Sequence, residues 1–121
     1  MSYQLTKKFG LPHGHAVALC LAKVWHRMLQ EPRECLLTGG IPELERRFSQ
    51  LATLLGAATA QEAADQWDRR LDRWQMARPQ STQRESDLEE LSTSVNAARL
   101  GNNPVKLTQQ DLRALYERIL L

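Results

Sequence analysis

Apolar residues recur at three- and four-residue intervals along most of the chain, which predicts helices and no strands. The most apolar stretch covers residues 13–29, where apolar side chains occupy nearly every side of the expected helix. A helix of this kind is usually buried, so we expect it at the centre of the fold. The residues of its main stripe are Val17, Cys20, Leu21, Val24 and Met28. Pro32 ends this helix, because proline disfavours the helical conformation of Glu31 before it.

Further helices follow, each with its own start or stop signal. Gly56 is placed to end one helix, since glycine readily adopts the conformation that follows a helix C-terminus. Thr59 with Glu62, and Thr108 with Asp111, have the spacing of capping boxes at helix starts. The sequence therefore predicts an all-α bundle of about five helices around residues 13–29, the other helices covering residues 42–55, 60–76, 87–91 and a last segment from 108.

The remaining segments are interpreted as loops or as exposed faces. Residues 1–12 are expected to be a loop, and Met1–Leu5 to be poorly ordered. The acidic row Asp65, Asp68 and Asp72 alternates with arginines, which is typical of a solvated helix face. The three tryptophans are expected to be core or interface anchors, and these are Trp25, Trp67 and Trp74.

Length and charge exclude several classes of protein. At 121 residues the chain is long enough for one domain with its own core, which we expect to span residues 1–121. The 16 basic and 14 acidic residues are interspersed, which disfavours a nucleic-acid-binding surface. No apolar run approaches the ~20 residues that span a bilayer. Cys20 and Cys35 make no disulfide framework, and Cys20 is expected to be a buried free thiol, so we expect a cytoplasmic protein. From the charge and the short apolar runs, we expect no membrane and no nucleic acid as partners.

His13 is the strongest candidate for chemistry in the chain. Gly10 permits backbone angles that other residues avoid, and Pro12 fixes its own φ, so together they would hold His13 at the mouth of a helix. There its ring nitrogen could point into a cleft. His15 must point elsewhere, because helical neighbours two apart do not share a face. From the residues alone, a loop or helix-capping histidine is the simpler interpretation of His13.

Two blocks of sequence carry a family resemblance. Ser2-Tyr3-Gln4-Leu5-Thr6, followed by Phe9-Gly10-Leu11-Pro12-His13-Gly14-His15-Ala16-Val17, resembles the segment that opens the helical domain of iron-containing (group III) alcohol dehydrogenases. The lead-in is similar to that of phosphonoacetaldehyde-reductase-like members. Ser94-Val95-Asn96 and the stretch from Leu100 to Thr108 resemble the last loop and helix start of the same family. The resemblance covers nearly the whole chain, but only the C-terminal part of such an enzyme.

The resemblance implies a fold, a metal site and a cofactor. It implies the C-terminal domain of the dehydroquinate-synthase-like fold, with His13 as one ligand of Fe(II) or Zn(II) and with Gly14 leaving space beside it. The metal would polarise the oxygen of an aldehyde or alcohol, and NAD(P) would exchange the hydride. Tyr3 and His15 would belong to the substrate pocket.

The resemblance also implies what these residues lack. The family's other ligands, an aspartate and two histidines, and its nucleotide-binding domain fall outside the sequence. A catalytic site needs about three protein ligands, so we expect no catalytic residue, no tightly bound metal or cofactor, and no activity from this chain alone.

Two functions remain as hypotheses. One is the metal-side half of a dehydrogenase, with a separately encoded nucleotide-binding domain as partner. The other is a non-catalytic, self-associating helical module that buries its former domain interface in a homo-oligomer. A small regulator that binds nucleic acid is disfavoured by the balanced charge.

Overall fold

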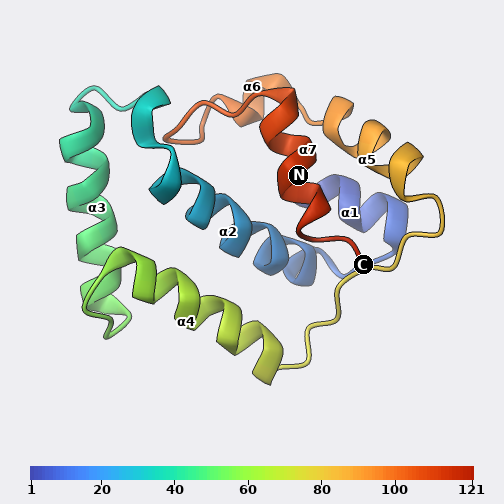
Figure 1. Ribbon diagram of the computed structural model, residues 1–121, viewed down its shortest axis with the longest axis horizontal. Coiled ribbons are helices and arrows are strands. Elements are labelled where there is room, and N and C mark those ends of the chain that lie inside the picture. Colours follow the sequence, from blue (N-terminus) through green and yellow to red (C-terminus); the bar gives the residue numbers. More distant parts are fainter.

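The computed structural model describes residues 1–121, and it confirms an all-helical chain without strands. The helix α2 crosses the centre of the molecule, with α1, α5 and α7 on one side and α3 and α4 on the other (Figure 1). The helices are α1 (Ser2–Phe9), α2 (His13–Gln30), α3 (Gly40–Leu54), α4 (Ala60–Arg73), α5 (Arg84–Thr93), α6 (Ala97–Leu100) and α7 (Gln109–Glu117), with a 3-10 turn at Pro32–Glu34.

Three apolar clusters form the core, and α2 contributes buried residues to the two larger ones, while Leu107, Leu112 and Leu115 form the smallest. The first half of α2 packs with α1, α5, α7 and the end of α4. This cluster comprises Leu5, Ala16, Leu19, Cys20, Ala22, Leu71, Leu88, Leu91, Tyr116, Ile119 and Leu120. The second half of α2 packs with α3 and α4, where Trp25 stacks on Phe48 with ring centroids 5.8 Å apart. The prediction of a central helix over residues 13–29 is therefore confirmed to within one residue at its end.

The N-terminal segment differs from the prediction, because residues 2–9 form the helix α1 instead of a loop. Leu5 is completely buried in the core, and the Tyr116 hydroxyl donates a hydrogen bond of 3.0 Å to the Met1 carbonyl oxygen. Lys8 also forms an ion pair of 2.9 Å with Asp87 at α5. The expectation that Met1–Leu5 are poorly ordered is wrong, since packing against α2 and α7 holds this short helix in place.

The stripe predicted for the central helix is only partly buried. Cys20 and Met28 lie in the core, but Val17 and Leu21 are each 41% exposed. The buried face of α2 is rotated toward the residues Ala16, Leu19, Ala22, Trp25 and His26. Apolar residues surround this helix, and so the sequence pattern alone could not say which side remains uncovered.

Helix ends follow the local signals closely. Thr108 and Asp111 form the full capping box at α7, and the Thr59 hydroxyl accepts the Glu62 amide hydrogen at 3.1 Å. The Glu62 carboxylate accepts from the Ala58 amide at 2.8 Å and not from Thr59, so the second box is shifted by one residue. Gly56 has φ +71 after α3, the conformation expected of a glycine stop.

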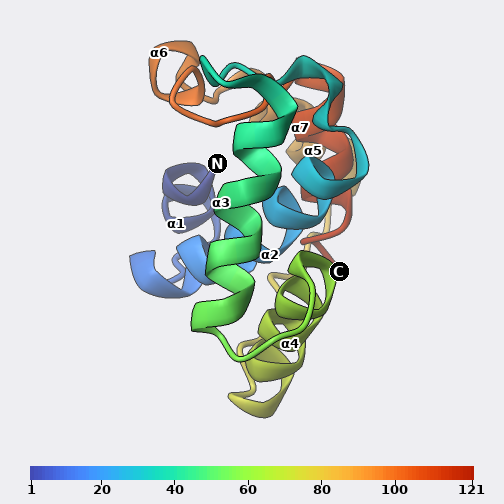
Figure 2. The same cartoon turned by 90° about the vertical axis from the view of Figure 1, so that its left-hand side faces the viewer.

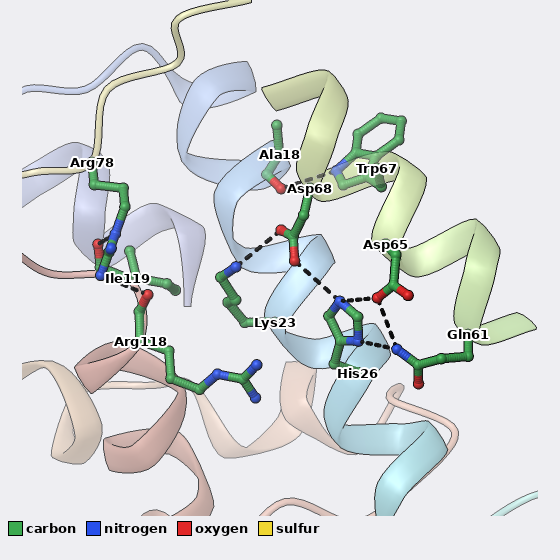
Figure 3. Close-up of polar contacts among 10 residues, drawn as sticks. All are labelled: Ala18, Lys23, His26, Gln61, Asp65, Trp67, Asp68, Arg78, Arg118 and Ile119. Carbon is green, nitrogen blue, oxygen red and sulfur yellow. Dashed lines mark hydrogen bonds and ion pairs between the residues drawn. The ribbon is translucent and has the colours of Figure 1, made fainter. Parts of the chain in front are cut away.

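The helix α4 ends earlier than predicted, at Arg73 instead of residue 76. Gln75 turns the chain with φ 53, which leaves Trp74 58% exposed and set edge-on against Trp67. Trp74 is therefore not a core anchor, and the alternative that it anchors an interface stays a prediction. After this turn, Arg78 donates hydrogen bonds of 2.9 Å to the carbonyl oxygens of Arg118 and Ile119, and so ties the loop to the end of α7 (Figure 3).

Candidate functional site

The exposed side of α2 forms the floor of a groove of about 980 Å³. We call it the α2 groove. It is bounded by the start of α1 and by the segment that carries α6, which in Figure 2 projects above α1. Its 18 lining residues are Met1, Ser2, Tyr3, Gln4, His13, Val17, Cys20, Leu21, Val24, Ser94, Val95, Asn96, Arg99, Leu100, Asn102, Asn103, Pro104 and Leu107. The two blocks of sequence that carry the family resemblance thus face each other across one cavity.

His13 is the first residue of α2, and it is exposed on the wall of this groove. Gly10 ends α1 with φ 67, the left-handed region that glycine tolerates best, and its amide donates to the Thr6 carbonyl oxygen. Pro12 then takes φ −53 and starts α2. The turn that Gly10 and Pro12 form between α1 and α2 therefore places an imidazole at the helix mouth, as the sequence predicts.

Tyr3 and His15 are placed differently relative to His13. Tyr3 lines the same groove and is 62% exposed. His15 is half-buried and does not line the groove, and its Nε2 atom is buried without a hydrogen-bond partner. Gly14 faces open space, because a Cβ atom added there would meet no atom within 4 Å. The structure thus brings Tyr3 and His13 together and directs His15 elsewhere.

A metal ion needs more ligands than this groove offers. Within residues 1–121, no three His, Cys, Asp or Glu side chains lie close enough together to hold a metal. Cys20 reaches the groove wall, but burial raises the pKa of its thiol to about 12, so it remains protonated near neutral pH. Catalytic zinc sites use about three protein ligands. These residues therefore do not by themselves fit an iron or zinc site, and His13 is the one histidine at the groove.

A second polar centre lies between α2 and α4 and was not anticipated. His26 is buried, its Nε2 atom is 3.1 Å from the Asp68 carboxylate and 3.7 Å from that of Asp65, and Gln61 contacts its Nδ1 atom at 3.0 Å (Figure 3). Lys23 forms an ion pair of 2.9 Å with Asp68. The interpretation of the acidic row as a solvated face is therefore wrong for Asp68, which contacts both Lys23 and His26 on α2. The Asp65 side chain is still 44% exposed, and Asp72 is exposed.

The sequence did contain a signal for this polar cluster. Lys23 and His26 are polar residues three apart on the largely apolar α2, and Asp65 and Asp68 have the same spacing on α4. Residues three apart share a helix face, so these two pairs can meet where the helices pack. Because the Lys23 ammonium and the buried imidazole partner the carboxylates, the cluster serves to join α2 to α4.

Comparison with known proteins identifies the family. The family model described as Fe-containing alcohol dehydrogenase family, C-terminal, matches residues 1–120. Searches among curated proteins and among solved structures give no match. None of the helices is both long and apolar enough to cross a membrane. The match covers all seven helices and both walls of the α2 groove, and the chain therefore belongs to the Fe-containing alcohol dehydrogenase family as its C-terminal helical domain.

Proposed function

We propose that this chain forms the metal-facing wall of an NAD(P)-dependent iron-containing alcohol dehydrogenase, in which His13 provides one ligand to Fe(II) or Zn(II). The observation that carries the proposal is the exposed imidazole at the start of α2, on the wall of a cavity of about 980 Å³. In this proposal, residues outside 1–121 provide the other metal ligands and the binding site for the dinucleotide. The bound metal would supply Lewis-acid polarisation of an aldehyde or alcohol oxygen.

In this proposal, different residues of the groove bind the metal, contact the substrate and exclude water. His13 holds one side of the metal, and the exposed Tyr3 hydroxyl lies on the same wall, where it can contact substrate. Val17 and Leu21 form an apolar floor that limits the number of water molecules beside the reacting carbon. The resemblance of the Ser2–Thr6 lead-in supports membership of the phosphonoacetaldehyde-reductase-like branch.

The ligand role can be tested on the chain itself by following its three imidazoles by NMR during a Zn²⁺ titration. We expect weak binding that shifts the His13 ring signals first, because only this imidazole is exposed at the groove. The variant His13→Ala should lose that binding, whereas the matched variant His15→Ala should keep it. Zinc binding that persists in His13→Ala and disappears in His15→Ala would refute the assignment.

Dehydrogenase function needs a second measurement. The purified chain is mixed with a dinucleotide-binding domain of the same family, Fe²⁺, NADH or NADPH, and a short aldehyde. We expect oxidation of the nicotinamide only when both proteins are present, and its loss in His13→Ala. Activity that is equal with His13→Ala would show that this histidine is not a ligand in the assembled enzyme.

A self-associating module is the second candidate function, and a second groove favours it. This α3 groove has a volume of about 530 Å³. It is lined in part by α3, the helix that stands at one end of the molecule (Figure 1). Its lining is apolar apart from Arg47, and it comprises Leu21, Trp25, Met28, Leu44, Arg47, Phe48, Leu51, Leu54, Leu55, Trp67 and Pro104. Leu54 is 82% exposed at its edge, a large apolar side chain that a second copy of the chain could cover.

A further inference from the structure

One side of the end of α4 carries three arginines and an exposed tryptophan. Arg69 and Arg73 are exposed, Arg70 is half-buried, and Trp74 is 58% exposed. Residues three and four apart share a helix face, so these four residues lie along one side of the end of the helix. We call this surface the α4 patch. None of its residues lines the α2 groove or the α3 groove, so it is a separate surface of the molecule.

The carboxylates of α4 do not neutralise these arginines. Asp65 precedes Arg69 by four residues, the spacing of a favourable ion pair, but its carboxylate lies 3.7 Å from His26 on α2 instead. Asp68 is 2.9 Å from Lys23 of the same helix. The three arginines of the patch form no ion pair and donate no side-chain hydrogen bond within the chain. The patch keeps its positive charge because the nearest carboxylates contact other groups.

Trp74 is held in a defined position beside the arginines. Its ring stands edge-on to that of Trp67, with ring centroids 6.3 Å apart. The Trp67 indole N–H donates a hydrogen bond of 3.3 Å to the Ala18 carbonyl oxygen on α2 (Figure 3). Gln75 then turns the chain with φ 53, so no further helical turn covers the Trp74 indole. An aromatic ring that is already fixed loses little conformational entropy when a partner covers it.

We propose that the α4 patch is a docking surface for an acidic segment of another protein, whose carboxylates contact the arginines and whose apolar side chain covers Trp74. Charge complementarity selects this partner, because Asp72 is the one exposed carboxylate between residues 66 and 78. The planar guanidinium of an arginine binds both oxygens of a carboxylate. Arginine and tryptophan are also the residue types that most often dominate the binding energy of protein interfaces.

Two other anionic partners fit the patch less well. A nucleic acid binds to a broad basic footprint along its phosphates, whereas the basic surface here consists of three arginines and the net charge of the chain is only +2. A membrane surface binds a helix that exposes a whole apolar face. The buried residues of α4 are its apolar residues Ala63, Ala64 and Leu71, so this helix has no such face to offer.

The test titrates the full chain with a short synthetic peptide of glutamate, leucine and glycine, and follows the indole N–H signals of the three tryptophans by NMR. The same peptide with glutamine in place of glutamate is the control compound. We expect saturable shifts at Trp74 with the acidic peptide and none with the control, and weaker binding as salt is added, because salt screens exposed charges. The absence of these shifts would overturn the proposal. Tighter binding of polyuridylate or of phosphatidylglycerol vesicles at Trp74 would also overturn it.

Matched variants separate the patch from general attraction to positive charge. Arg70→Gln and Arg73→Gln should each lower the affinity for the acidic peptide about two- to fivefold, the range expected for one exposed ion pair. Trp74→Ala should lower it more than about fivefold, as expected for a residue at the centre of an interface. Arg33 is exposed on the 3-10 turn and forms no ion pair, so Arg33→Gln should leave the affinity unchanged. Equal losses in Arg33→Gln and Arg73→Gln, or full affinity in Trp74→Ala, would contradict the assignment of the patch.

Discussion

Two residues that share the wall of the α2 groove show how burial decides chemistry. His13 is exposed at the first turn of α2, whereas Cys20, two turns further along, is only 6% exposed. Burial disfavours the charged thiolate and raises the pKa of Cys20 to about 12. Near neutral pH the buried thiol therefore stays protonated, whereas the imidazole lies exposed at the start of the helix. The chemistry of the groove depends on depth as well as on residue type.

The Cys20 thiol should consequently react slowly with a disulfide reagent such as Ellman's reagent, since the thiolate is the reactive form. In the variant Cys35→Ser, Cys20 is the remaining thiol, and we expect full reaction only after unfolding in urea. As pH rises through the ordinary thiol pKa of 9.0, the rate should continue to increase without levelling off. The variant Cys20→Ser, with its half-buried Cys35, should react faster. A plateau near the ordinary pKa with Cys35→Ser would contradict the burial.

At the scale of elements, α1 shows that packing can make a helix where the sequence pattern is weak. It has eight residues, no side-chain cap at its start and one fully buried side chain, Leu5. An isolated helix of this length is unstable in water, because few hydrogen bonds offset the cost of nucleation. Contacts with α2 and α7 stabilise it. The groove wall that carries Tyr3 thus depends on the packing of Leu5.

We expect Leu5→Ala to lower the free energy of unfolding by about 2–5 kcal/mol, the usual range for a leucine truncated in a core. Tyr3→Ala, on the same helix but largely exposed, should change it by less than about 0.5 kcal/mol. Urea unfolding followed by circular dichroism measures both values. If the two variants are equally stable, α1 is not anchored in the core as described.

At the scale of the whole molecule, the two grooves lie on one face, where apolar side chains remain partly exposed. Leu21 and Pro104 line both the α2 groove and the α3 groove, so the two cavities are neighbours. Leu51 and Leu54 add exposed apolar surface on α3. Large exposed apolar patches mark surfaces where proteins associate. This arrangement agrees with a face that meets another domain or another copy of the chain.

If a second copy covers the α3 groove, Leu54→Glu should weaken self-association, because it places a charge at the apolar contact. Sedimentation velocity over a range of protein concentrations measures the effect. Leu36→Glu is the matched control, since Leu36 is 53% exposed and lies outside both grooves. A wild-type chain that remains monomeric at every concentration would exclude the self-associating module.

Much of the local structure could be predicted because its causes lie within a few residues. The stop at Glu31 and Pro32, the capping box of Thr108 and Asp111, and the placement of His13 all depend on neighbouring backbone groups. Short-range hydrogen bonds and the fixed φ of proline decide them. The motifs around His13 also indicated the family that the comparison then confirmed.

The tertiary structure decided which faces meet, since that depends on residues far apart in the chain. His26 and Asp68 are 42 positions apart and meet only because α2 packs on α4. The arginines at the end of α4 stay unpaired for a related reason, because Asp65 and Asp68 contact other groups. The sequence by itself determined the central helix, the capped starts of α4 and α7, and the position of His13 at a helix start. Only the packing of these helices determined which side of α2 stays open and which residues line it, because burial is a property of the assembled chain.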